Sequence, residues 1–132
     1  MKREEYKKLN EEFLLNKEKE EGVTKITDGV LYKVIRKGKG SATPRRNSIV
    51  TVHYKGRLIN GKEFDSSYRQ RCAPAFRLNE LITGWQIAMQ QMHTGDKWEV
   101  TIAARHGYGT RTVGNIPAFS TLVFEIELIA IA

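Results

Sequence analysis

Apolar and polar side chains alternate along much of this chain, and the clearest case is its middle. Residues 49–58 alternate strictly, and Tyr54 lies among the apolar positions of one face. The pair Asn60-Gly61 follows, which is a strong signal for a hairpin. The chain then returns through Phe64 and Asp65. The pattern predicts two neighbouring antiparallel strands that carry two aromatic rings and one carboxylate.

Further segments have the composition or alternation of strands: residues 30–35, 76–78, 98–102 and 122–128. Between them the period changes to a helical one over residues 80–91, with Trp85 on the apolar stripe. Gly84 lowers the helix propensity there, so a position without a side chain must be needed beside Trp85. Strands around one short helix indicate an α+β fold, an antiparallel sheet wrapped on that helix.

The first residues differ in character from the rest. Residues 3–21 are predicted to form a charged helix, with Tyr6, Leu9 and Phe13 on one stripe, and Gly22 is a plausible stop. The apolar positions are too few for a free-standing coiled coil, so the helix packs on its own domain or pairs with another chain. We therefore divide the chain into a helix over 1–22 and a domain over 23–132.

Composition narrows the class of protein. A chain of 132 residues suffices for one domain with an ordinary core. The single cysteine, Cys72, excludes an intrachain disulfide. The net charge of +7 is dispersed over turns and strand faces, so we expect no specific nucleic-acid interface. No apolar run suits a membrane span, and the N-terminus lacks a signal-peptide core. We expect a cytoplasmic protein, with the periplasm or cell envelope as the alternative if a signal has been removed.

Most catalytic chemistries lack their usual residues here. His53, His93 and His106 show no metal-ligand spacing with one another or with Cys72, so we expect no metal. There is no Gly-x-Ser-x-Gly elbow, and no pair of carboxylates is placed for acid–base work. Hydrolysis and redox chemistry are therefore disfavoured, and no cofactor is expected.

Aromatic side chains at bends and strand ends are the positive signal: Tyr54, Phe64, Trp85, Tyr108 and Phe124. Any one of them could be an ordinary core residue. However, Tyr108 lies between two glycines, where a purely structural tyrosine is less expected. Asp65 directly follows Phe64 and needs a partner if it is buried. Aromatic walls with a single polar anchor suit a small apolar group.

Several segments together resemble the catalytic domain of FKBP-type peptidyl-prolyl cis-trans isomerases, in the order of that family. They are 52–56 (Val-His-Tyr-Lys-Gly), 61–67, 76–78, 82–85 (Ile-Thr-Gly-Trp), 107–109 (Gly-Tyr-Gly), 116–117 and 121–128. The charged helix also resembles the end of the N-terminal extension of bacterial members, which builds a dimer in longer relatives.

This resemblance implies a twisted half-barrel sheet around the short helix and a pocket for proline. It implies Trp85 as the floor, Tyr54, Phe64 and Phe124 as walls, and Leu81 and Ile116 at the rim. Substrate would accept hydrogen bonds from the Ile82 backbone N–H and the Tyr108 hydroxyl. Asp65 would be held by neighbouring hydroxyl or basic donors and would face the rotating carbonyl. The implied partners are proline-containing unfolded or flexible polypeptides and macrolide inhibitors, and the implied state is a monomer or weak dimer through the N-terminal helix.

The chain departs from the family pattern at some positions. Gln70 stands where members commonly carry an arginine that pairs with Asp65, so Arg69 or Arg71 is the alternative partner. Gln70 is therefore counted with the substrate-binding positions. Pro74 and Asn115 replace larger apolar groups of the pocket and rim. The favoured function is peptidyl-prolyl isomerisation in protein folding, and the alternative is a weakly active or inactive chaperone or binding module.

Overall fold

The computed structural model describes all 132 residues. Its helices are α1 (Arg3–Glu18) and α2 (Thr83–Met89), and neither combines the length and apolar content that a membrane span requires. The strands are β1 (Val23–Thr27), β2 (Val30–Arg36), β3 (Ile49–Arg57), β4 (Glu63–Ser66), β5 (Ala75–Arg77), β6 (Lys97–Ile102) and β7 (Leu122–Ile131). Short 3₁₀ turns lie at Ser67–Arg69, Leu78–Glu80 and Ala104–His106.

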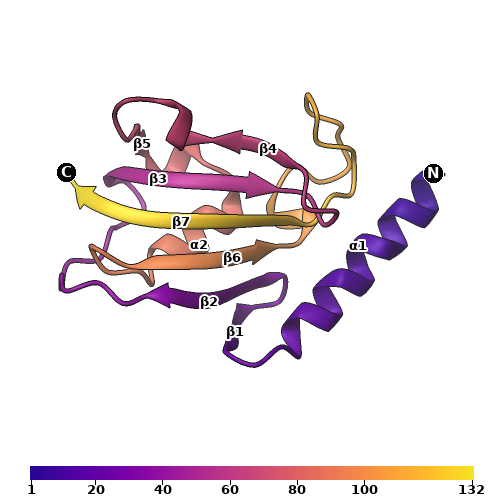
Figure 1. Ribbon diagram of the computed structural model, residues 1–132, viewed down its shortest axis with the longest axis horizontal. Coiled ribbons are helices and arrows are strands. Elements are labelled where there is room, and N and C mark those ends of the chain that lie inside the picture. The colour runs from indigo at the N-terminus through magenta and orange to yellow at the C-terminus, as the bar shows by residue number, and fades with distance from the viewer.

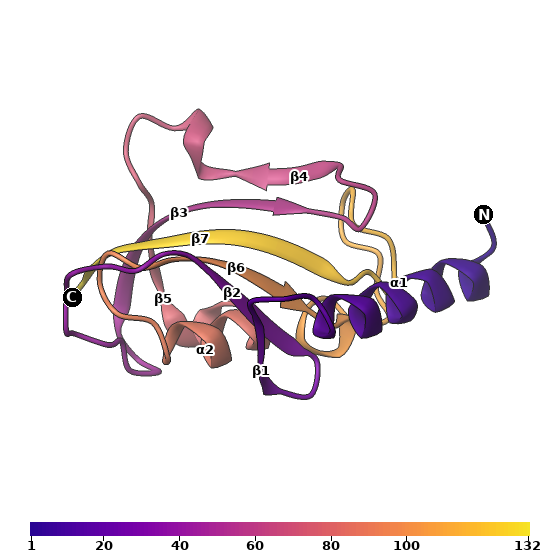
Figure 2. The same cartoon turned by 60° about the horizontal axis from the view of Figure 1, so that its bottom comes forward.

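All strands belong to one antiparallel sheet, in the order β1-β2-β6-β7-β3-β4. The strand β3 pairs with β7 along one edge and with both β4 and β5 along the other. The sheet is curved, α2 crosses one of its faces, and α1 extends beyond one end (Figures 1 and 2). This arrangement confirms the predicted α+β half-barrel around one short helix.

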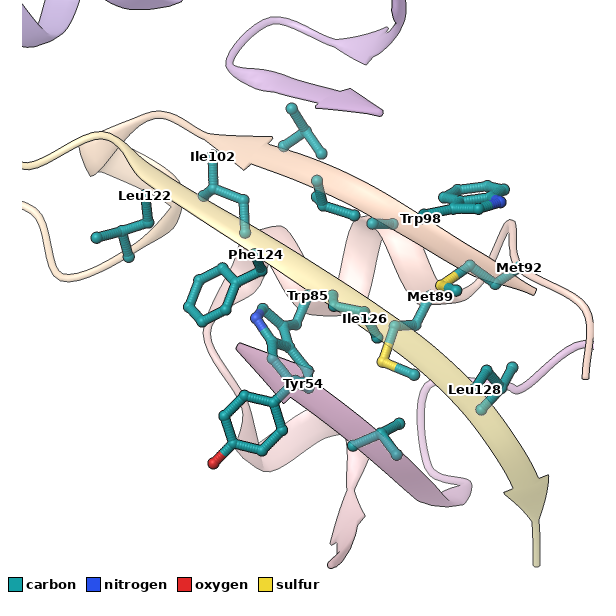
Figure 3. Packing of buried hydrophobic residues seen from close by; sticks show 14 of the residues in the cluster. Tyr54, Trp85, Met89, Met92, Trp98, Ile102, Leu122, Phe124, Ile126 and Leu128 are labelled. Carbon is teal, nitrogen blue, oxygen red and sulfur yellow. The ribbon is translucent and has the colours of Figure 1, made fainter. Parts of the chain in front are cut away.

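The core lies between α2 and one face of the sheet (Figure 3). Alternate residues of β3 are buried as the sequence pattern predicts, and Trp85, Ala88 and Met89 of α2 pack against them. A Cβ atom at Gly84 would lie 2.5 Å from the Ile102 Cγ2 atom. The glycine is therefore needed because α2 touches β6 at this point.

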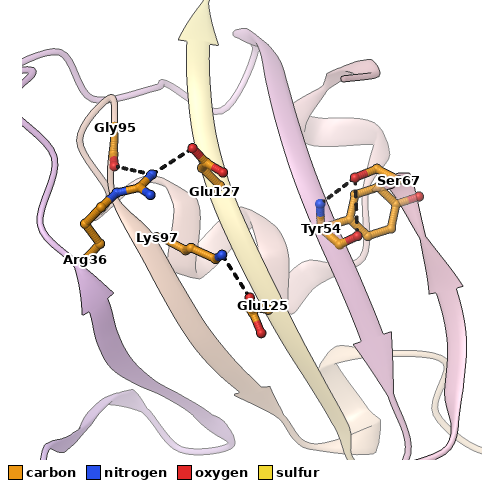
Figure 4. Close-up of polar contacts among 7 residues, drawn as sticks. All are labelled: Arg36, Tyr54, Ser67, Gly95, Lys97, Glu125 and Glu127. Atoms are coloured by element: carbon orange, nitrogen blue, oxygen red, sulfur yellow. Dashed lines mark hydrogen bonds and ion pairs between the residues drawn. The ribbon is translucent and has the colours of Figure 1, made fainter. Parts of the chain in front are cut away.

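The opposite face of the sheet carries charged pairs between neighbouring strands. Figure 4 shows Arg36 bonded to Glu127 at 2.7 Å and Lys97 bonded to Glu125 at 3.1 Å. Such partly exposed pairs each stabilise a protein by less than about 1 kcal/mol. Their main effect is that this face of the sheet remains polar and solvent-exposed, so the apolar core forms on the face that α2 covers.

The helix α1 packs on its own domain, and the predicted stripe contributes in part: Tyr6 and Phe13 are half-buried, but Leu9 is not. Leu9 is 42% exposed, whereas Asn10 is only 1% exposed. The Asn10 Oδ1 atom accepts a 2.7 Å hydrogen bond from the Thr121 N–H, and its main-chain carbonyl accepts one from the Thr121 hydroxyl. A buried polar residue thus replaces the expected leucine, because its contact is made with backbone groups of a loop.

Both helices are shorter than the sequence pattern predicts. The first ends at Glu18, three residues before the predicted end, and the chain turns at Gly22 with a φ of +84°. The second begins at Thr83 because Leu81 and Ile82 are extended, with ψ values of 166° and 149°. These two extended residues carry the chain past the edge of the core before α2 starts.

The end of α1 is held by a half-buried carboxylate on β6. Glu99 contacts Lys17 of α1 at 2.7 Å and Arg57 of β3 at 3.0 Å. Burial alone would raise the pKa of Glu99, but the hydrogen bonds from Lys17 and Arg57 outweigh it and hold that pKa below its ordinary value. A lowered pKa means that the stabilisation is present above the ordinary glutamate pKa and is lost as the pH falls through the lowered one.

We expect Glu99→Gln to lower the free energy of unfolding at pH 7 by about 1 kcal/mol, since partial exposure screens both pairs. The deficit relative to wild type should shrink as the pH falls below about 4.5. Urea unfolding of wild type and Glu99→Gln between pH 7 and 3 measures this deficit. Glu12→Gln, on the exposed side of α1, is the control. A deficit that stays constant over this range would contradict the assignment.

Candidate functional site

A cavity of about 280 Å³ opens between α2 and the curved sheet. Its wall is mainly apolar, with two carboxylates at the edge. The lining residues are Tyr54, Phe64, Asp65, Phe76, Glu80, Leu81, Ile82, Trp85, Tyr108 and Phe124. They come from β3, β4, β5, α2, β7 and the loops before α2 and after β6. The size and composition suit one small apolar group with a polar attachment.

The aromatic rings of this cavity pack edge to face. The Trp85 ring lies 5.2 Å from the Tyr54 ring and 5.2 Å from the Phe124 ring, at interplanar angles of 83° and 86°. Phe64 meets Phe124 at 5.5 Å and 88°, and Phe76 meets Tyr54 at 6.1 Å. Edge-to-face contacts of this kind fix ring orientation beyond what burial alone does. The walls are therefore rigid before any ligand arrives.

A glycine in β3 makes this ring packing possible. A Cβ atom at Gly56 would lie 2.6 Å from the Phe64 Cζ atom and 2.7 Å from the Phe124 Cε1 atom. Gly56 pairs with Phe124 on one side and with Asp65 on the other. The backbone of β3 thus forms part of the support beneath two walls of the cavity.

The carboxylate of Asp65 is held by hydroxyl and backbone donors. The Tyr54 hydroxyl donates to Oδ2 at 2.9 Å, and the Ser66 N–H donates to Oδ1 at 2.9 Å. Arg69 instead pairs with Glu63 at 3.0 Å, and Arg71 makes no ion pair. Of the two kinds of donor expected for Asp65, the structure therefore shows a hydroxyl, that of Tyr54, and neither Arg69 nor Arg71 pairs with the carboxylate.

That contact also changes the acidity of the tyrosine. Burial raises the pKa of Tyr54 well above its ordinary value, and the hydrogen bond to the negative Asp65 raises it further. The hydroxyl therefore remains a hydrogen-bond donor over the whole physiological range.

Two donors at the cavity have no partner within the protein. The Ile82 N–H makes no internal hydrogen bond, although the Ile82 carbonyl accepts from Trp85 and Gln86 at the start of α2. The Tyr108 hydroxyl is likewise unbonded. Burial, and then the nearby charge of Asp65, raise the pKa of Tyr108. Both groups are free to donate to a carbonyl oxygen of a ligand.

The structure brings together eight of the ten residues predicted for the site and leaves two outside. Gln70 lies in the exposed turn after β4, where its N–H donates to the Ser67 carbonyl. Ile116 packs into the hydrophobic core beside the loop bridge to Val113. Neither lines the cavity.

Two lining residues were not predicted, Phe76 and Glu80. For Phe76 the sequence held a signal, because it lies within a predicted short strand of alternating pattern. Its partner in β3 is Val50, which shares a face with Tyr54, so the register directs Phe76 to the same side. Glu80 ends a 3₁₀ turn, and no periodicity marks such a position.

Comparison with known proteins shows the family to which this chain belongs. The family model described as FKBP-type peptidyl-prolyl cis-trans isomerase matches residues 40–129. The chain therefore belongs to the FKBP-type peptidyl-prolyl cis-trans isomerase family. The match covers β3 to β6, β7 up to residue 129, and every residue that lines the cavity.

Several relatives are similar over most of this chain. The FKBP-type 22 kDa peptidyl-prolyl cis-trans isomerase of Escherichia coli is 45% identical over 120 residues, which are 90% of this chain and 58% of that protein. The FkpA isomerase of Aeromonas hydrophila is 40% identical over 127 residues, 96% of this chain and 47% of the relative. This chain thus spans about half the length of the curated relatives that it matches.

A solved structure of similar length also matches. The peptidyl-prolyl cis-trans isomerase of Pseudomonas syringae superposes with a TM-score of 0.91 at 38% identity, covering 100% of this chain and 97% of that one. The structure of FkpA from Escherichia coli gives a TM-score of 0.90 at 37% identity, covering 97% of this chain and 60% of the other. The alignment with the Pseudomonas syringae structure includes the N-terminal helix.

The close approach at Gly56 leads to a prediction. We expect Gly56→Ala to destabilise the protein by about 1–3 kcal/mol, as overpacking of a filled core does. It should also displace the rings of Phe64 and Phe124, which aromatic NMR shifts would report. Gly61→Ala is the matched control for the ring shifts. Its φ of +87° strains the backbone of an alanine, but no atom lies within 4 Å of the added Cβ, so no ring is pushed. Unchanged ring shifts in Gly56→Ala would overturn this account of the walls.

Proposed function

We propose that this protein is a peptidyl-prolyl cis-trans isomerase that accelerates rotation about X–Pro bonds in other polypeptides. The observation that carries the proposal is the aromatic cavity with Trp85 at its centre and two unpaired donors beside it. The cavity contains no paired acid and base. Rotation of an amide needs none, since no covalent bond is made or broken.

The physical task is to favour the twisted amide over the planar one. Amide resonance creates a barrier of about 18–20 kcal/mol to rotation. The planar amide is more charge-separated than the twisted transition state, so an apolar site that excludes water favours the latter. The rings around the cavity supply such surroundings. Each tenfold acceleration requires about 1.4 kcal/mol of this differential stabilisation.

The polar groups at the edge orient the peptide and act on the rotating bond. In the proposed complex the Ile82 N–H and the Tyr108 hydroxyl donate to substrate carbonyls, which fixes the proline ring in the cavity. In the same proposed complex, Asp65 faces the carbonyl before proline as it turns. Its negative charge disfavours the oxygen of the planar amide more than that of the twisted amide, which carries less negative charge. Its bond from Tyr54 holds that charge in position.

The proposed partners are proline-containing segments of unfolded or flexible polypeptides, with a role in protein folding. Macrolide inhibitors that imitate a proline-containing segment are proposed ligands of the same cavity. A monomer or weak dimer through α1 stays a prediction. The compartment, cytoplasmic with the periplasm or cell envelope as the alternative, also stays a prediction.

Loss of one aimed hydroxyl should reduce the activity without affecting the fold. We expect Tyr108→Phe to lower kcat/KM for a Leu-Pro peptide by about 3- to 12-fold, the equivalent of one hydrogen bond. A cis-trans assay that reads proline isomers directly by NMR exchange measures it. Tyr68→Phe is the matched control, since Tyr68 is an exposed tyrosine outside the cavity. A wild-type rate equal to the uncatalysed rate would refute the proposed function.

The acidities of the two tyrosines predict the pH dependence. The pKa values of Tyr54 and Tyr108 are both raised, so both hydroxyls stay protonated to higher pH than an ordinary tyrosine. We expect kcat/KM to vary less than about twofold between pH 7 and 9.5, below the ordinary tyrosine pKa of about 10. A fall centred below pH 9 in the same NMR assay would contradict it.

A further inference from the structure

We propose that α1 positions the loop 107–121 at the edge of the cavity, and that Asn10 is the main positioning residue. The inference rests on the proposed function, because this loop carries Tyr108 next to the cavity. It adds a role for a helix that lies outside the cavity and outside the matched range 40–129.

The contact begins at a buried polar residue. Asn10 is the one buried residue of α1. Its Oδ1 atom accepts from the Thr121 N–H at 2.7 Å, and its Nδ2 atom donates back to the Tyr6 carbonyl at 2.7 Å. The Thr121 hydroxyl donates to the Asn10 carbonyl at 3.1 Å. Because Thr121 is itself buried, water has little access to replace these bonds.

Residues of the preceding turns of α1 also contact the loop. The Tyr6 and Ser120 hydroxyls lie 2.7 Å apart, and Ser120 donates in turn to the Pro117 carbonyl. An Arg3 nitrogen donates to the Thr110 carbonyl at 3.3 Å. The helix lies beside the loop (Figures 1 and 2). Its hydrogen bonds therefore reach the loop near both ends of the loop.

The loop contains one residue with a strained backbone, and two side chains of α1 lie over its ring. Phe119 has a φ of +67°, the sole non-glycine residue of the protein with a positive φ. The Arg3 guanidinium lies 4.8 Å and the Lys7 ammonium 5.3 Å from the centre of its ring. Cation–π contacts of this kind offset the cost of the backbone conformation.

That conformation connects the helix to Tyr108. In it the Phe119 N–H donates to the Gly109 carbonyl at 2.9 Å, and the Gly109 N–H donates to the Ala104 carbonyl at 2.7 Å. Gly109 directly follows Tyr108 and has a φ of +62°. The turn around Tyr108 is closed by the Gly107 and Gly109 N–H groups, which both donate to the Ala104 carbonyl. The bond from Phe119 to Gly109 joins this turn to the part of the loop that α1 contacts.

The energetic consequence concerns binding more than chemistry. If the loop is released, the arrangement with Tyr108 beside the cavity becomes only a fraction of the population. The apparent dissociation constant rises by the inverse of that fraction, whereas the bound complex is unchanged. A variant that merely unfolds part of the protein would lower kcat in proportion to the unfolded fraction and leave KM alone.

The experiment uses the full-length chain with Asn10→Ala, Asn10→Asp and Tyr6→Phe. Asn10→Asp keeps the acceptor for the Thr121 N–H, and Tyr6→Phe removes a single hydroxyl in case Asn10→Ala folds poorly. Glu12→Ala is the control on the exposed side of α1. Amide hydrogen exchange reports the loop, and NMR exchange with a Leu-Pro peptide reports KM and kcat.

For Asn10→Ala we expect exchange at the Thr121, Phe119 and Gly109 amides to quicken about tenfold or more, with β7 amides unchanged. We expect KM to rise about 3- to 10-fold while kcat stays within about twofold. Asn10→Asp should recover part of both effects, Tyr6→Phe should show a smaller version, and Glu12→Ala should show neither. Loop exchange and KM unchanged in both Asn10→Ala and Tyr6→Phe would overturn the inference. If wild type proves inactive, the proposed function fails, and the exchange data alone still decide whether α1 holds the loop.

Discussion

Trp85 lies edge to face against Tyr54 on β3 and Phe124 on β7, and the position of α2 under the sheet follows from these two contacts. They require a close approach on both sides of the tryptophan. Gly84 allows α2 to reach Ile102, and Gly56 leaves room for the rings of the adjacent strands. A methyl group at either glycine would separate elements that the aromatic packing joins.

The same side chains therefore serve the core and the cavity. Tyr54, Trp85 and Phe124 are buried members of the hydrophobic cluster, and each also lines the cavity. The cavity is the place where the core is left incomplete, between the N-terminal end of α2 and the edge of β4. Charged pairs on the other face of the sheet exclude a second core there. This explains why one short helix suffices to build both a stable fold and a rigid recess.

Much of the fold could be predicted because its signals are local. The alternation in β3 and the Asn60-Gly61 turn are properties of short segments, and the structure confirms both, with Gly61 at a φ of +87°. The errors concern contacts between distant segments. Asn10 replaces Leu9 at the α1 interface because Thr121 offers a backbone N–H there. At Asp65 the sequence left a hydroxyl and an arginine open as donors, and the structure shows the Tyr54 hydroxyl. Gln70 and Ile116 came from the family resemblance, and neither reaches the cavity in this chain.

The pairing of β3 with β7 has a consequence for the order of folding. Within the sheet, this ladder contains the pairing of largest sequence separation, Val50 with Ile131. Such non-local pairings form slowly, because loop-closure entropy is lost before the contacts compensate for it. Tyr54 and Phe124 sit on these two strands, and Trp85 stands between their rings. The recess therefore forms only once this long-range pairing is made, and a chain in which β3 and β7 are still apart lacks it.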